Sequence, residues 1–197
     1  MTEAVEHLLL RQAQQGSYDA FTELHDLLEP GVKRFVGRLI GHGQEAEDIT
    51  QDTLIALYTN LCRIDPVENL RPYVFRIARN RCYDVLRRQG RFEDVSLDDE
   101  PAEMRVSFSN SHLIAAPEDV THWLLLHLEV QEAMERLPEL QRQTLVFYCE
   151  EELSYAEIAE IMNVSIGTVK SRLFHARTTL RGLLRPDTLR AIGDSLY

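Results

Sequence analysis

Apolar residues recur every three or four positions through most of this chain of 197 residues, and the two-residue alternation of strands is nearly absent. That spacing places the apolar side chains on one face of an α-helix. The first stripes are Val5, Leu8, Leu9 and Ala13; then Phe21, Leu24 and Leu28; then, after Pro30-Gly31, Val32, Phe35, Val36, Leu39 and Ile40. Because Pro and Gly interrupt helices, we expect separate helices before and after position 30.

Two further helices, over residues 48–61 and 71–88, each combine an apolar face with a polar one. The first has Ile49, Thr53, Ala56, Leu57 and Leu61 on its apolar side, and Asp48, Gln51, Asp52 and Ile55 on the other. The second has Val74, Ile77, Ala78, Cys82 and Val85 on its apolar side, and Arg76, Arg79, Asn80, Tyr83 and Arg87 on the other. The pattern therefore predicts four to five helices in residues 1–91, with two candidate interaction surfaces.

The helical pattern stops at Phe92. Residues 92–120 hold eight acids and one base, and their apolar residues follow no sustained period. Such a segment buries too little apolar area to offset the entropy of ordering it, so we expect a flexible acidic linker. Periodicity returns at 121–185, and a tail bounded by Pro186 covers 186–197. The predicted fold class is all-α, with two small helical domains joined by the linker.

A helix-turn-helix is predicted within the second domain. Ser154 and Glu157 have the spacing of a capping box, Ala159 is small enough for a close helix crossing, and Asn163 tolerates a left-handed turn. Ser165 can cap the next helix. That helix has its apolar residues at i, i+4, i+7 and i+11, namely Val169, Leu173, Ala176 and Leu180. This is the spacing of a helix-turn-helix.

The other face of that second helix is rich in side chains that can contact DNA. Lys and Arg bind guanine N7 and O6 in the major groove, Ser and Thr are permissive donors, and aromatic rings can touch thymine methyls. The candidate residues are Ser165, Thr168, Lys170, Ser171, Arg172, Phe174, His175 and Arg177. The alternative is a solvated basic face on an ordinary helical bundle.

The formal net charge of −11 argues against a free-standing nucleic-acid binder, but the charge is unevenly distributed. Residues 71–91 carry +6 and residues 165–185 carry +5, whereas residues 1–70, 92–120 and 121–164 each carry −7. In the first basic helix the arginines lie near Tyr73 and Phe75, a mixture that suits unpaired bases. The alternative is that these two rings complete the core.

Other classes of protein are disfavoured. Cys62, Cys82 and Cys149 form no metal-ligand spacing, so we expect no metal and no cofactor. The acids at 150–152 and the two histidines His122 and His127 do not converge, and no glycine-rich phosphate loop is present, which argues against an enzyme. No apolar run approaches the ~18–20 residues of a membrane span, and no signal peptide is evident, so a cytoplasmic protein without membrane association of its own is expected.

Three stretches together resemble the sigma subunits of bacterial RNA polymerase, in the small extracytoplasmic-function (ECF) group that keeps only regions two and four. Residues 44–58 are similar to the core-binding helix of region two, and residues 73–88 to its promoter-melting helix. Residues 137–177 are similar to region four. The resemblance places region two at 1–91 and region four at 121–185. The departures are Tyr73 or Val74, where members often have Trp, and Leu54, where they often have Phe.

The resemblance implies roles for the candidate surfaces. Asp48, Gln51, Asp52 and Ile55 would dock on the clamp of the largest subunit of core RNA polymerase, with region four on its flap. Arg76, Arg79, Asn80, Tyr83 and Arg87 would hold the melted −10 element of promoter DNA. The second helix of the helix-turn-helix would read the −35 element, the linker would follow the RNA path, and an anti-sigma factor would regulate the chain.

The competing hypothesis is a stand-alone helix-turn-helix transcription regulator. Such a protein needs neither the acidic surface at 48–55 nor the arginine-rich helix at 76–87, and it usually carries a sensor or dimerisation domain. Binding to promoter fragments without polymerase would favour it.

Overall fold

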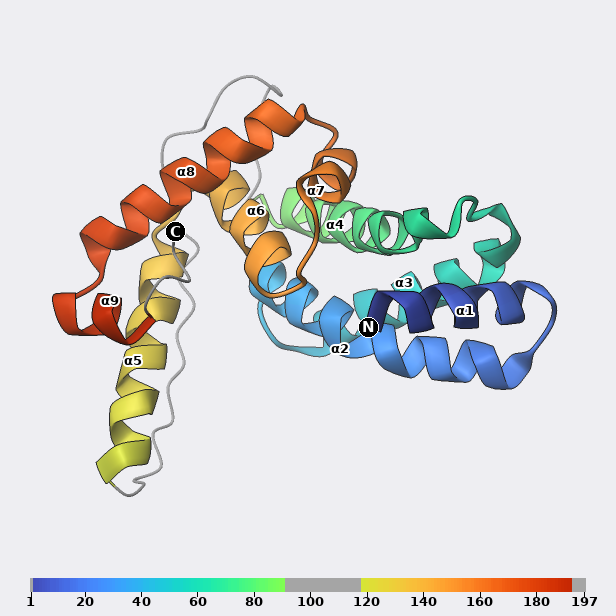
Figure 1. Ribbon diagram of the computed structural model, residues 1–197, viewed down its shortest axis with the longest axis horizontal. Helices are drawn as coiled ribbons and strands as arrows, with labels where there is room; N and C mark the ends of the chain where they lie inside the picture. The colour runs from blue at the N-terminus through green and yellow to red at the C-terminus, as the bar shows by residue number, and fades with distance from the viewer. Residues whose placement is uncertain (1, 91–117, 193–197) are drawn as a thin grey trace. The chain divides into compact units, whose positions relative to one another are not determined.

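The computed structural model describes residues 2–90 and 118–192, and within them it contains nine α-helices, two short 3-10 helices and no strand (Figure 1). The prediction of an all-α fold is confirmed. The described residues form two compact units: residues 2–90 together with Val146–Ile166, and residues 118–145 together with 167–192. Most of the predicted acidic linker, 92–117, lies outside the described residues, and its last three residues are already helical.

Helix α1 (Thr2–Gln14) buries a different face from the one that its apolar residues predict. Val5 and Leu8 are 45% and 56% exposed, whereas Glu6 is buried beside Leu9, Leu10 and Ala13. The prediction for Val5 and Leu8 was therefore wrong. The reason is an arginine distant in sequence: Nε and Nη2 of Arg71 donate to the two carboxylate oxygens of Glu6, each over 2.8 Å, and draw the Glu6 face inward.

Helix α2 (Tyr18–Ile40) runs through Pro30 without a break, which corrects the predicted separation at that point. Leu24, Leu28, Val32 and Phe35 are all buried and continue one stripe across the proline. A proline inside a helix removes one backbone hydrogen bond. Burial of the same face on both sides outweighs that loss.

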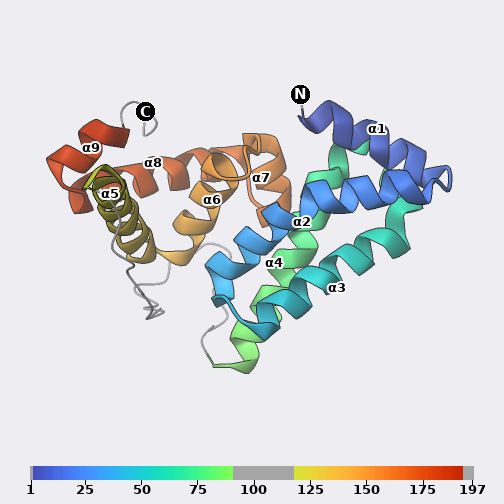
Figure 2. The ribbon, with the colours of Figure 1, turned by 90° about the horizontal axis from the view of Figure 1, so that it is seen from below.

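Helix α4 (Leu70–Arg88) is central to the first unit, where it packs against α2, α3 (Gln44–Asn60) and α7 (Tyr155–Met162) (Figure 2). Short 3-10 helices η1 (Leu61–Arg63) and η2 (Val67–Asn69) connect α3 to α4. Three aromatic rings lie at the centre of the core. Phe35 stacks on Phe147 with ring centroids 4.5 Å apart, and Phe75 meets both edge-on at 5.7 Å.

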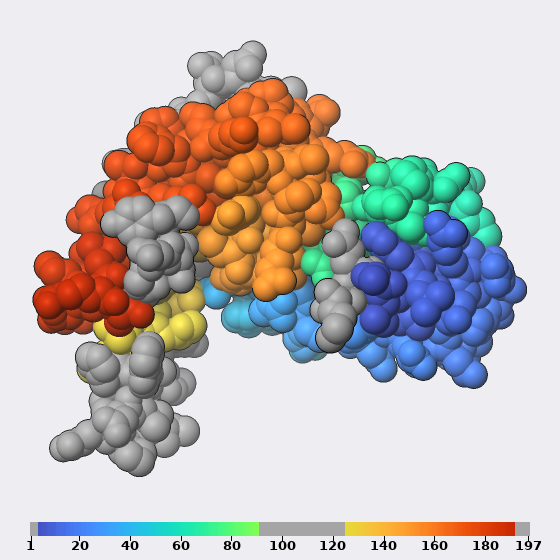
Figure 3. Space-filling view, viewed as in Figure 1, coloured from blue at the N-terminus to red at the C-terminus, as the bar shows by residue number. Residues whose placement is uncertain are grey.

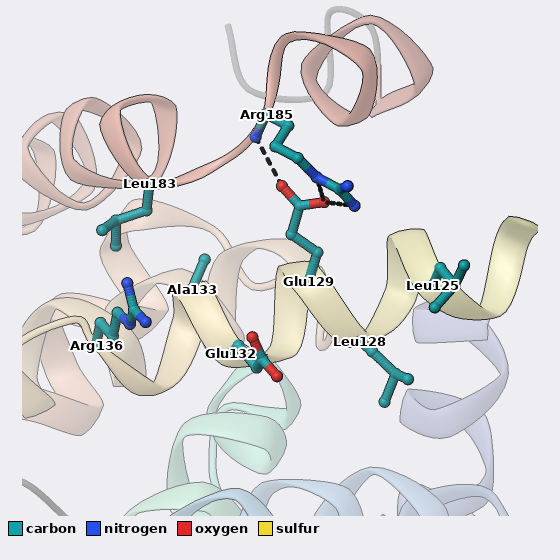
Figure 4. A pocket seen from close by; sticks show the side chains of 8 residues that line it. All are labelled: Leu125, Leu128, Glu129, Glu132, Ala133, Arg136, Leu183 and Arg185. Atoms are coloured by element: carbon teal, nitrogen blue, oxygen red, sulfur yellow. Dashed lines mark hydrogen bonds and ion pairs between the residues drawn. The ribbon is translucent and has the colours of Figure 1, made fainter. Parts of the chain in front are cut away.

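The second unit contains α5 (Glu118–Glu135), the first part of α6 (Glu139–Cys149), all of α8 (Ile166–Leu183) after its first residue, and α9 (Pro186–Ile192). Residues 186–192, predicted only as a tail, thus form a helix. Contacts with Glu129 of α5 hold the start of α9 in place (Figure 4). The Glu129 carboxylate accepts hydrogen bonds from the backbone N–H of Arg185 at 2.7 Å and from Nε of the same arginine at 2.8 Å. It also accepts from the hydroxyl of the fully buried Thr188, which lies in α9, at 2.8 Å. A cavity of about 400 Å³ lies beside these contacts.

We expect Arg71→Ala to lower the free energy of unfolding by about 3–5 kcal/mol, because it leaves the Glu6 carboxylate buried without a partner. Hydrogen bonding to Glu6 raises the pKa of Arg71, in keeping with a guanidinium held by that carboxylate. The measurement is urea unfolding followed by circular dichroism. The control is the double variant Glu6→Leu/Arg71→Met, which removes both charges and should lose much less stability. Equal losses in the single and double variants would contradict this account.

The Glu129 contacts predict a specific pH dependence. The hydrogen bonds from Arg185 lower the pKa of Glu129 to about 2. A carboxylate with a lowered pKa in the folded chain contributes stability above its unfolded pKa and loses it as the pH falls through the folded value. The melting temperature of the native chain should therefore exceed that of Glu129→Gln at pH 7, and the difference should shrink as the pH falls from about 5 toward 2. A constant difference over that range would refute this role.

Candidate nucleic-acid interface

The turn between α7 and α8 has the predicted local geometry. The Ser154 hydroxyl accepts from the backbone N–H of Glu157 at 3.3 Å, and the Glu157 carboxylate accepts from the N–H of Ser154 at 2.8 Å, so the capping box is confirmed. Asn163 ends α7 in the left-handed conformation, with φ 53° and ψ 50°. The N–H of Val164 then donates to the carbonyl of Ala159 at 3.0 Å. These contacts hold the turn that precedes α8.

Helix α8 buries the predicted apolar residues Val169, Leu173, Ala176 and Leu180. Most of the candidate DNA-contacting side chains are accessible: Ser165, Lys170, Ser171, Phe174 and His175 are exposed, and Thr168 and Arg177 are half-buried. Arg172 is only 8% exposed, so its predicted outward position was wrong. It follows Val169 by three residues, and the i+3 position of a helix falls on the same side as the i+4 position that Leu173 occupies.

The polar stripe of α4 is partly as predicted. Arg76, Asn80 and Arg87 are exposed, and Arg79 is half-buried. Tyr83, however, is only 6% exposed, so its predicted place on the open stripe was wrong. It lies next to Cys82, on the edge of the buried face. Phe75 is buried in the core, so for this ring the alternative interpretation, that it completes the core, is correct.

The side chains of Tyr83 and Arg79 are in direct contact on α4. The guanidinium carbon of Arg79 lies 4.3 Å from the centroid of the Tyr83 ring, and Nη2 donates to the phenol oxygen at 3.2 Å. A cation over an aromatic face is attracted by the quadrupole of the ring. Tyr83 is thus placed to orient the arginine rather than to contact a ligand itself.

Helix α3 presents its four candidate residues together. Asp48, Gln51, Asp52 and Ile55 are all exposed, and Ile55 is 58% exposed. Arg81 of α4 donates to Asp52 at 2.7 Å, and Gln44 donates to Asp48 at 2.9 Å. The surface therefore mixes carboxylates with an exposed aliphatic side chain.

Two contributors were not predicted from the sequence. Tyr58 is 55% exposed one turn beyond Ile55, and its ring lies 4.8 Å from that of Phe21, which extends the apolar part of the α3 surface. Gln14 holds the connection between α3 and α4, because its Nε2 donates to the carbonyls of Leu61 and Ile64, each at 2.9 Å. The i+3 spacing from Ile55 could have pointed to Tyr58. Nothing in the sequence pairs Gln14 with a loop some fifty residues away.

Among the described residues, no group of three or more His, Cys, Asp or Glu side chains could hold a metal ion. No helix in this part of the chain is long and apolar enough to cross a membrane.

Both basic helices lie in segments of the chain that match known protein families. Residues 24–92 match the family "Sigma-70 region 2", and residues 127–180 match "Sigma-70, region 4". The ECF RNA polymerase sigma factor SigW of Bacillus subtilis is 33% identical over 179 residues, which cover 89% of this chain and 95% of SigW. The chain belongs to the ECF group of the sigma-70 family. The RNA polymerase sigma-H factor of Pseudomonas aeruginosa is 29% identical over 94% of this chain and 97% of its own.

Solved structures agree with this assignment. The sigma factor RpoE from Bartonella quintana, in complex with the anti-sigma factor NepR, is 27% identical with a TM-score of 0.61, over 85% of this chain and 98% of that one. CnrH, in complex with the cytosolic domain of CnrY, has the same fold with a TM-score of 0.64 at 21% identity, over 91% and 96% of the two chains. This ECF sigma factor is thus a promoter-directing transcription initiation factor and not an enzyme.

Proposed function

We propose that this sigma factor docks on core RNA polymerase through the exposed face of α3, formed by Asp48, Gln51, Asp52 and Ile55. The observation that carries the proposal is that all four side chains are accessible on one side of α3, opposite the buried Ile49, Thr53 and Leu57. Carboxylates of this kind suit a basic helical surface on the clamp of the largest subunit. Such charge-complementary contacts set orientation and rate of association more than raw affinity.

The exposed stripe of α4 is proposed to hold the melted −10 element. Arg76 and Arg87 can follow phosphates, and Asn80 offers donors and acceptors to the edge of an unpaired base. Arg79, oriented by Tyr83, offers a planar guanidinium for stacking. Capture of unstacked bases offsets an unstacking cost of a few kcal/mol, so binding alone can drive strand opening.

The outer face of α8 is proposed to read the −35 element as duplex DNA, with region four on the polymerase flap. Arg172 is left out of this surface because it is buried. The residues that remain are Ser165, Thr168, Lys170, Ser171, Phe174, His175 and Arg177. Of these, Lys170 and Arg177 supply positive charge for guanine or phosphate, and the 66% exposed Phe174 supplies an apolar contact for a thymine methyl.

The cellular location and a regulatory partner of the protein are also proposed. A sigma factor acts where the polymerase acts, in the cytoplasm. The solved relative RpoE is bound to an anti-sigma factor, NepR. We expect this chain to have an anti-sigma partner as well, one that covers the surfaces described above.

The direct test is run-off transcription with purified core polymerase and the DNA upstream of the gene that encodes the chain. A transcript of defined length that requires the chain, together with a complex with core polymerase on gel filtration, is the expected result. Absence of both would overturn the proposal. Specific promoter binding without polymerase would instead favour a stand-alone regulator.

The α3 surface has its own test in Asp48→Lys and Asp52→Lys. Each reversal should weaken core binding at least about tenfold, because like charges across an interface cost several kcal/mol. Helical content should be unchanged, since the ion pair of Asp52 with Arg81 is exposed and contributes about 1 kcal/mol or less. Asp187→Lys is the matched control, because it makes the same charge change on an exposed residue of α9. An equal loss in the control would show that net charge, not the α3 surface, sets the affinity.

The role of Tyr83 is tested with the holoenzyme and a single-stranded −10 oligonucleotide. Tyr83→Phe keeps the ring under Arg79 and should bind nearly as well as the native chain. Tyr83→Leu removes the aromatic face and should bind about 2- to 30-fold more weakly, which corresponds to ~0.5–2 kcal/mol of cation–π interaction. Core binding serves as the folding control for both variants. If Tyr83→Leu binds the oligonucleotide as well as Tyr83→Phe, Tyr83 does not position Arg79 for DNA.

A further inference from the structure

The connection between α3 and α4, residues 61–69, has a buried inner edge and an exposed outer edge. Apolar side chains recur at every third position into the first residue of α4, which is the period of a 3-10 helix, and all of them are buried: Leu61, Ile64, Val67 and Leu70. The exposed side chains between them are Cys62, Arg63, Asp65, Pro66 and Glu68. The connection is therefore a packed part of the fold that presents polar groups to solvent.

Gln14, the last residue of α1, holds the first part of this connection. Its Nε2 donates to the carbonyls of Leu61 and Ile64, each at 2.9 Å. A side-chain amide has two N–H donors, and these two carbonyls take both of them. Backbone carbonyls of buried residues need a partner, and an orphaned one costs free energy comparable to a lost hydrogen bond. One side chain therefore satisfies two carbonyls that flank a turn of the chain.

The far end of the connection is anchored to the same helix. Arg71, in the first turn of α4, pairs with the buried Glu6 of α1. Helix α1 also packs on both η1 and η2. Figure 3 shows the dark-blue atoms of α1 directly against the blue-green atoms of this part of the chain. Helix α1 thus braces the connection at both ends.

The outer edge of the connection continues the exposed stripe of α4. Arg76 lies only about 10 Å beyond Asn69 along the helix, at about 1.5 Å per residue. That length corresponds to about three phosphates of one DNA strand, at about 3.4 Å each. The exposed Asp65 and Glu68 repel phosphates, but carboxylates accept hydrogen bonds from the amino groups of bases. A strand held along α4 would therefore meet the connection with a base rather than with its backbone.

We propose that Gln14 is a positioning residue for recognition of the −10 element. It contacts no DNA in this role, but it fixes the connection so that Asp65 and Glu68 stand beside the strand on α4. A recognition loop that is already ordered loses less conformational entropy on binding and holds its polar groups in the geometry that one base fits best. The proposal rests on the −10 role proposed above for α4, and the two hydrogen bonds of Gln14 carry it.

The hold of Gln14 on the connection can be measured by hydrogen exchange on the full chain. The N–H groups of Ile64 and Asn69 are hydrogen-bonded within the connection, at 3.2 and 3.0 Å, so their exchange reports whether it is formed. Gln14→Met keeps the length of the side chain without its donors. It should speed the exchange of both amides at least about fivefold, because the connection opens locally, and leave the centre of α4 unchanged. Gln12→Met, the same change at an exposed residue of α1, is the matched control and should alter neither amide.

Discrimination between bases is measured with the holoenzyme and single-stranded −10 oligonucleotides, each altered at one position. The ratio of affinities for two bases at a position measures how well that position is read. Gln14→Met should reduce this ratio at least about threefold at one position or more, because a base contact that depends on the connection is lost. A chain that is merely less stable binds every oligonucleotide more weakly by the same factor, so its ratios do not change. Gln14→Lys, whose ammonium can donate to both carbonyls, should recover at least half of the lost discrimination.

Unchanged exchange at Ile64 and Asn69 in Gln14→Met, or unchanged ratios at every position, would overturn the proposal. A Gln14→Lys chain that discriminates no better than Gln14→Met would overturn it as well. Failure of the −10 role of α4 has a different signature. The native holoenzyme would then bind all the altered oligonucleotides alike, whereas the exchange of the Gln14→Met chain would still rise.

Discussion

The burial of one face of α4 is the constraint on which the rest of the first unit depends. Val74, Ala78 and Cys82 are fully buried, so the rotation of this helix about its axis is fixed. Because side chains on the opposite side follow at helical spacing, Arg76, Asn80 and Arg87 must then face outward. Packing of α2, α3 and α7 around α4 thus determines which side chains of this helix are exposed.

The same packing brings acids from distant parts of the chain to the arginines of α4. Arg71 pairs with Glu6, Arg76 with Glu160, Arg81 with Asp52 and Arg88 with Glu45. Only the first of these pairs has a fully buried carboxylate, and exposed pairs are weak and screened by salt. Most of the arginines can therefore exchange an intramolecular acid for a phosphate at little cost. We expect the net charge of −11 to oppose indiscriminate binding of the free chain to nucleic acid.

Local sequence signals predicted local structure well. The limits of α7, its capping box and the left-handed Asn163 follow from interactions within a few residues, and the structure has all of them. Predictions that depend on distant partners were less accurate. Burial of Glu6 requires Arg71, continuity of α2 through Pro30 requires a common core on both sides, and α9 requires Glu129. The sequence analysis placed Tyr83 and Arg172 on the open faces of their helices. Each is next in sequence to a buried residue, Cys82 or Leu173, and only the packed neighbours decide the side.

The exposed stripe of α4 is proposed to capture the unpaired −10 strand, and every other assignment to this helix follows from that role. The most direct measurement uses promoter DNA with 2-aminopurine at a −10 position, mixed with core polymerase and this chain. The fluorescence should rise without ATP as the base unstacks. With Asn80→Ala the complex should still form on the duplex, but the rise should be slower and smaller. A rise as large and as fast as that of the native chain, both in Asn80→Ala and in the double variant Arg76→Ala/Asn80→Ala, would contradict this role.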